Sequence, residues 1–154
     1  MKTAHDKQVS QATSFLKELL VQAGLDLGFQ CEAEEEGLVV RLYGHDAGIV
    51  LSGGARPLYA INHILNRALY ERGPEAFNLI VDCNDYRRTR AEELESLARK
   101  AAESVKESGD FYLFDPMPAS ERRVVHLALA EEPGVMTESE GGGAQRRVVI
   151  LPAK

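Results

Sequence analysis

The chain has 154 residues, 44% of them hydrophobic, so it can bury the core of one ordinary domain or of two small ones. Its net charge of −6 counts against a protein that coats nucleic acid with its whole surface, because such proteins are basic overall. No apolar run approaches the roughly 18 residues that span a bilayer, and no signal peptide is evident, so we expect a cytoplasmic protein without a membrane span.

The N-terminal part of the chain predicts a helix followed by a hairpin. Residues from about 8 to 23 repeat apolar side chains at helical spacing, and Gly24 ends the pattern. Residues 27–33 and 38–43 read as two strands, and the acidic segment 34–37 between them predicts a turn.

A glycine-rich loop and a second helix come next. The loop, residues 51–56, leads into a helix that opens at Pro57, whose fixed φ suits a first helical turn. The apolar stripe expected on this helix is Leu58, Ile61, Leu65 and Leu69. After Gly73 and Pro74, residues 77–81 are continuously apolar apart from one Asn, which favours a third strand at the centre of the sheet.

A long helix of about 21 residues follows the third strand. Asp85 is its candidate N-cap, and Gly109 can take the left-handed conformation that ends a helix. The side chains expected on its buried side are Leu94, Leu97, Ala98, Ala101 and Val105.

The rest of the chain predicts a strand, a helix and a second hairpin. The strand covers residues 111–114 and the helix residues 118–131. The hairpin pairs 135–139 with 147–151 through a turn at 141–143. The whole order is αββα-β, the long helix, then βαββ, which predicts an α+β fold with two subdomains, residues 8–85 and 86–154.

Basic residues are concentrated in the second subdomain. Residues 1–85 carry 7 Lys and Arg against 12 Asp and Glu, whereas residues 86–154 carry 11 against 12. We therefore expect any polyanion site in the second part. Cys31 and Cys83 lie far apart in apolar runs, which predicts buried free thiols, with no metal site, disulfide or cofactor.

The loop before the second helix is the first candidate site. A glycine-rich turn at a helix N-terminus lets backbone N–H groups approach a phosphate. The order of elements and this loop resemble the KH fold, in its type II arrangement, in which such a loop clamps single-stranded nucleic acid. The pattern is degenerate, because the four-residue loop lacks its outer glycines and inner cations, so a structural turn is the alternative. The residues concerned are Ser52, Gly53, Gly54, Ala55 and Arg56.

The second candidate site is the predicted helix at 118–131. Arg122 and His126 lie four residues apart, so they project from one face and can grip a phosphate together or stack on a base. On spacing alone, such a pair is more often an ordinary solvated helix face.

Several short signatures in this region occur in one order at compatible spacings. They are Tyr86-Arg87-Arg88-Thr89-Arg90, Pro116-Met117, the run from Glu121 to Leu129, the run from Gly134 to Gly141, and Arg146-Arg147-Val148-Val149-Ile150. Together they resemble the Jag (SpoIIIJ-associated) family, which joins a KH domain to an R-3-H domain; the resemblance covers roughly residues 40 to 152.

The resemblance implies non-catalytic, sequence-tolerant binding of single-stranded RNA, or of DNA, by a bacterial regulator of the cell envelope or of elongation. Arg122 and His126 are then the signature pair. The residues implied at the border of the same surface are Arg123, Thr137, Ser139, Arg146 and Arg147. The missing GxxG loop puts RNA binding by the first subdomain in question, and the separate N-terminal domain of many relatives is absent from this sequence.

Three arginines at the start of the long helix form a third feature. Arg87, Arg88 and Arg90 oppose the helix dipole, which costs stability unless an anion is close. They could contact phosphate, or they could pair with nearby carboxylates such as Asp82 or Glu93.

Enzyme motifs are absent from the sequence: it has no P-loop and no HExxH zinc motif. The alternative to nucleic-acid binding is a protein-interaction module, in which the degenerate first subdomain forms a homodimer or docks on a small KH-protein partner. Because His126 titrates near neutrality, we also expect stronger RNA binding at mildly acid pH, and equal affinities at about pH 6 and about pH 8 would remove this prediction.

Overall fold

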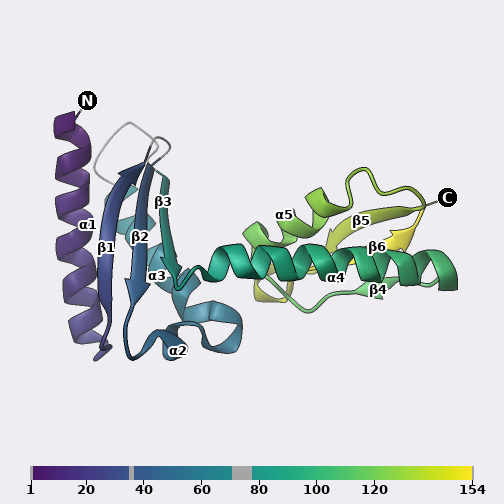
Figure 1. Cartoon of the computed structure of the whole chain (residues 1–154), viewed down its shortest axis with the longest axis horizontal. Helices are drawn as coiled ribbons and strands as arrows, with labels where there is room; N and C mark the ends of the chain where they lie inside the picture. The colour runs from purple at the N-terminus through teal and green to yellow at the C-terminus, as the bar shows by residue number, and fades with distance from the viewer. Residues whose placement is uncertain (1, 35–36, 71–77, 154) are drawn as a thin grey trace. The chain divides into compact units, whose positions relative to one another are not determined.

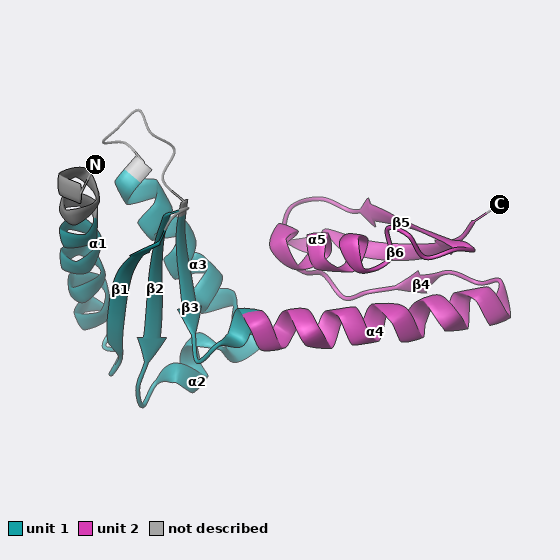
Figure 2. Cartoon of the chain, turned by 45° about the horizontal axis from the view of Figure 1, so that its top comes forward, with its two compact units in different colours: residues 1–87 teal, residues 88–154 magenta. Residues whose placement is uncertain are grey.

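The computed structural model of the chain describes residues 2–34, 37–70 and 78–153. It divides into two compact units, residues 1–87 and 88–154, each with its own sheet and its own hydrophobic core (Figure 2). The division falls two residues from the predicted boundary. Helices and strands are mixed in both units, as expected for the α+β class. No helix in the described ranges is long and apolar enough to cross a membrane.

Unit 1 is a three-stranded sheet with helices on one face (Figure 1). Its elements are α1 (Lys2–Gln22), β1 (Gly28–Glu34), β2 (Gly37–Tyr43), α2 (Ala47–Val50), α3 (Ser52–Tyr70) and β3 (Asn78–Cys83). Strand β2 lies in the centre, antiparallel to β1 and parallel to β3. The predicted hairpin is therefore confirmed, although residues 35 and 36 of its turn, and Gly73, Pro74 and Phe77, lie outside the described ranges.

The core of unit 1 follows the alternation of its strands. The inward-facing side chains of β2 and β3 are all buried, namely Leu38, Val40, Leu42, Leu79, Val81 and Cys83. The predicted stripe of α3 packs against them: Leu58, Ile61 and Leu65 are buried, and Leu69 is partly buried. Cys31 and Cys83 are free thiols; Cys83 is buried as predicted, whereas Cys31 is only partly buried, and burial raises the pKa of both.

The prediction of β3 as the central strand is wrong. Within the described residues β3 pairs only with β2, so it is an edge strand. Its burial alternates, with Leu79, Val81 and Cys83 inside and Ile80 36% exposed. The uninterrupted apolar run suggested burial on both faces, but Ile80 lies on the sheet face opposite the core.

Unit 2 contains the rest of the long helix and a second three-stranded sheet. The elements are α4 (Tyr86–Ser108), which begins in unit 1, then β4 (Tyr112–Leu113), α5 (Ala119–Ala128), β5 (Val135–Glu140), a short 3₁₀ turn (Gly143–Gln145) and β6 (Arg147–Pro152). The strands run antiparallel in the order β4-β6-β5. The predicted βαββ order is thus observed, with α5 ending three residues earlier than expected.

Helix α4 follows most of its predicted pattern. Its buried residues are Leu94, Ala98, Ala101, Ala102 and Val105. Leu97, which was predicted to be buried, is 41% exposed, and Ala102 takes its place. Gly109 ends the helix with φ of 75° and donates its N–H to the Val105 carbonyl, as predicted.

The start of α4 differs from the prediction. Asp85 precedes the helix, but its φ of 56° lies in the left-handed region, not in the extended region typical of an N-cap. The Asp82 carboxylate accepts the N–H of Arg87, 3.1 Å away, and so satisfies a donor of the first helical turn.

The sheet of unit 2 has one covered and one open face. Val148 and Ile150 on β6 face the core formed with α4 and α5. Thr137 and Ser139 on β5 pair with Ile150 and Val148, so they share that covered face. Their position beside α5 brings two hydroxyl groups to the predicted Arg and His pair.

Candidate nucleic-acid interface

Helix α5 presents a buried row of side chains and a polar row beside it. Pro118 precedes the helix with φ of −59° and accepts the N–H of Arg122 through its carbonyl. Val125 and Leu129 are buried in the core of unit 2. Arg122 and His126 are half-buried, and together they face strand β5 as their spacing predicted.

Four side chains form one hydrogen-bonded network between α5 and β5. Arg122 donates from Nη1 to Ser139 Oγ at 3.1 Å. The ring of His126 lies 2.7 Å from Thr137 Oγ1 through Nδ1 and 2.9 Å from Ser139 Oγ through Nε2. The structure therefore joins four of the residues that the sequence and the resemblance indicated.

One neutral tautomer of His126 accounts for both hydrogen bonds of its ring. The hydroxyl of Ser139 accepts from Arg122, so its own proton is free to go to His126 Nε2. The ring then carries its proton on Nδ1 and donates it to Thr137 Oγ1. In this assignment each of the two hydrogen bonds of the ring has one donor and one acceptor, and the imidazole is neutral.

Electrostatics favour the same neutral state of His126. Burial, and then the nearby Arg122 charge, lower the pKa of His126 from its ordinary 6.5. His126 therefore gains its proton at a lower pH than a free histidine does. The predicted increase in RNA affinity should accordingly also occur at that lower pH.

Unfolding experiments should detect this lowered pKa. The folded state binds the His126 proton more weakly than the unfolded state, so the corresponding stability is complete above pH 6.5 and is lost as the pH falls through the folded-state pKa. The loss in melting temperature between about pH 7.5 and about pH 5.5 should thus be smaller in His126→Gln than in the wild type. An equal loss in both proteins would mean that His126 carries no such linkage.

Arg122 keeps donors available beyond its bond to Ser139. A guanidinium has five N–H donors in a planar fork. Its Nε is buried and, among the described residues, has no hydrogen-bond partner. Such an unsatisfied buried donor costs about 1–3 kcal/mol.

Glu121 anchors α5 to α4 and takes no part in the network. Its side chain is 7% exposed and its Oε2 lies 3.1 Å from Arg90 Nε on α4. Arg90 also pairs with Glu93 at 3.2 Å. The carboxylate-pairing alternative for the arginines of α4 is thus observed for Arg90.

Arg87 is also engaged within its own unit. It donates from Nε to the Val81 carbonyl at 2.8 Å and from Nη2 to Asn62 Oδ1 at 3.1 Å. Its guanidinium carbon lies 5.0 Å from the centroid of the Tyr59 ring. These contacts make Arg87 part of the unit 1 structure, whereas Arg88 is exposed.

Arg147 is the first residue of β6, and Arg146 comes just before the strand. Arg147 pairs with Glu140, one position from the Ser139 and Val148 pair, so it belongs to the open face. Contrary to expectation, the structure does not bring Arg147 to the network. Arg146 is exposed, and its carbonyl accepts the N–H of Met117 just before α5.

The predicted loop at 52–56 forms a tight left-handed turn. Gly53, Gly54 and Ala55 have φ of 58°, 73° and 56°, between the short helix α2, which the sequence did not predict, and the rest of α3. Ala55 is fully buried, and Ser52 Oγ donates to the Ile49 carbonyl at 2.7 Å. Arg56 is therefore the charged side chain of this loop, which has no other cation.

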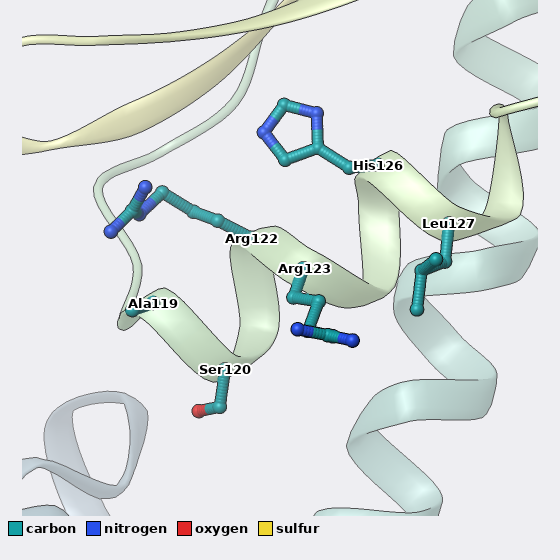
Figure 3. Close-up of a pocket in the computed structure, with 6 residues that line it drawn as sticks. All are labelled: Ala119, Ser120, Arg122, Arg123, His126 and Leu127. Atoms are coloured by element: carbon teal, nitrogen blue, oxygen red, sulfur yellow. The ribbon is translucent and has the colours of Figure 1, made fainter.

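A surface depression of about 500 Å³ adjoins the network on α5 (Figure 3). Its lining residues are Ala119, Ser120, Arg122, Arg123, His126 and Leu127. Ala119, Ser120 and Leu127 were not predicted. The sequence could have indicated Leu127, because this apolar residue lies four residues after Arg123 on an otherwise polar side of the helix. In the described ranges no group of three potential ligands could hold a metal ion.

Comparison with known families places this site in a recognised type of domain. Residues 92–152 match the R-3-H domain model. The match includes α5, β5 and the whole network of Arg122, His126, Thr137 and Ser139. It bears out the R-3-H half of the resemblance, and no part of unit 1 lies within it.

Relatives of known name extend the similarity beyond the R-3-H domain. The chain is 28% identical over 142 residues to "RNA-binding protein KhpB" of Clostridium symbiosum. The aligned region covers 91% of this chain and 64% of that relative. It is 31% identical over 146 residues to the protein of the same name from Lactiplantibacillus plantarum, and this alignment covers 90% of this chain and 42% of that relative. The Bacillus subtilis protein of that name is 31% identical over 109 residues, which are 70% of this chain and 52% of that relative. The chain thus spans between 42% and 64% of the length of these relatives.

Proposed function

We propose that this chain binds single-stranded RNA, without catalysis, through the face of α5 that carries Arg122 and His126, as a regulator of the Jag type. The observation that carries the proposal is the network that fixes both side chains against β5. A side chain held in place before binding loses less entropy on binding than a free one. The three relatives described above are named "RNA-binding protein KhpB", which agrees with this proposal.

The charge around α5 supports a polyanionic ligand. Two arginines and His126 line the depression, and no carboxylate does. The acidic residue nearest in sequence, Glu121, is turned into the unit and engaged by Arg90. Arg146 adds an exposed cation in the segment bonded to Met117. A phosphodiester strand therefore meets arginine donors with no opposing charge beside them.

We further propose that unit 1 is a degenerate KH-like subdomain of type II, with residues 52–56 in the place of the GxxG loop. The order of its elements and the turn between α2 and α3 support this. Its loop has one cation, and both Ser52 and Ala55 are used in local structure. Contact with a homodimer partner or a small KH protein is the second candidate function of this unit, favoured by this poor supply of phosphate ligands.

A titration with two forms of one RNA tests the main proposal. A labelled single strand of about ten nucleotides should bind, and the same sequence as a duplex should bind about tenfold more weakly, because a duplex hides its base faces and its deep groove excludes side chains. Fluorescence anisotropy measures both affinities. Equal affinities would point to charge attraction alone, and the lack of any binding would favour the protein-interaction function.

A further inference from the structure

The depression on α5 has two chemically different sides. Arg122 and His126 lie on the side tied to β5, and Figure 3 shows Arg123 and Leu127 leaving the helix on another side. Arg123 and Leu127 are four residues apart, which places them on one row, about 6 Å apart along the helix axis. Cationic and apolar groups therefore meet in one depression.

Leu127 is exposed where most of its neighbours in the depression are polar. Its exposed fraction is 64%, whereas Val125 on the same helix and Leu129 just after it are buried. A single exposed leucine is ordinary on a protein surface. This one, however, adjoins Arg123 and His126, and no Phe, Tyr or Trp lines the depression. The ring of His126 is held by Thr137 and Ser139, so Leu127 is the main apolar surface that a ligand can reach.

We propose that Leu127 is the nucleobase contact of this site, and that Arg122 and Arg123 hold the adjoining phosphate. This inference rests on the proposed function, because it assigns to the bound RNA a contact that the network alone does not provide. A nucleotide offers an anion and a flat, largely apolar face within one residue of the strand. The depression offers the matching pair of surfaces, and a contact to a base face tolerates any sequence.

A ribose-phosphate strand without bases can distinguish the proposed contact between Leu127 and a base from the binding of phosphate. Anisotropy titrations would compare a single-stranded RNA with an abasic ribose-phosphate strand of the same length. Leu127→Ala should weaken binding of the RNA about threefold to tenfold and leave binding of the abasic strand unchanged. Leu127→Trp should tighten RNA binding only, because a larger flat side chain covers more of a base. Leu97→Ala, which truncates a leucine that is 41% exposed on α4, should change neither.

Three results would overturn the inference. Unchanged RNA affinity in Leu127→Ala would show that no base contacts this side chain. An equal loss on both strands would make Leu127 a residue that shapes the phosphate site. If the wild-type protein binds neither strand, the proposed function itself fails, and the base contact fails with it. Melting temperatures close to that of the wild type would show that the variants are folded.

Discussion

Replacing Arg122 and His126 together by alanine should weaken the binding of single-stranded RNA by about tenfold to hundredfold. Arg122 supplies a charged fork of donors, and His126 supplies a ring that the hydroxyls of β5 hold in place. Both are half-buried beside the core, so their removal should cost some stability but should not unfold unit 2. Anisotropy titration and the melting temperature of the variant measure the two effects.

Arg99→Ala provides the matched control for this double variant. Arg99 is an exposed arginine on α4 and does not line the depression, so the variant loses a positive charge at another place in the same unit. Its RNA affinity should stay within about twofold of the wild type, because a distant exposed charge contributes little. If the double variant remains folded and binds RNA as tightly as the wild type, the assignment of the site to α5 is wrong.

The RNA affinity should fall steeply as the salt concentration rises. Binding to a single strand releases counterions, and each neutralised phosphate adds about 0.7 to the slope of log affinity against log salt. Contacts from Arg122, Arg123 and Arg146 would give about a 20-fold loss between about 50 and about 200 mM salt. Arg122→Ala should reduce the slope by about 0.7 if it removes one contact.

The salt titration also separates the two candidate functions. A protein-interaction module would retain labelled RNA weakly and with little change in affinity across this range. A slope that stays the same in Arg122→Ala would mean that Arg122 does not touch phosphate, even if the wild type binds RNA.

Spacing and alternation predicted much of this structure. The four-residue interval between Arg122 and His126 placed both on one helix face, and the family resemblance added Thr137 and Ser139, which the structure brings within hydrogen-bond distance. Residues 135–139 form a strand, as predicted, and the alternation of side chains along a strand explains why these two hydroxyls share a face. Local patterns are sufficient where a helix or strand period decides which side chains meet.

Other features depend on partners that are far away in the sequence. Glu121 looks like an ordinary solvated carboxylate, and its burial follows only from the pairing with Arg90 on another helix. Arg147 was grouped with Arg146, but the pairing of Arg147 with Glu140 on β5 places it on the sheet face opposite Ser139. Helix α2 is only four residues long, which is too short to show a helical period.

Amide chemical shifts of the full chain during titration with single-stranded RNA test the central claim most directly. The account predicts that the largest shifts fall on residues 119–127 of α5 and residues 137–139 of β5, which carry the network and the depression. Shifts confined to unit 1, or to the open sheet face around Leu113 and Met136, would contradict it.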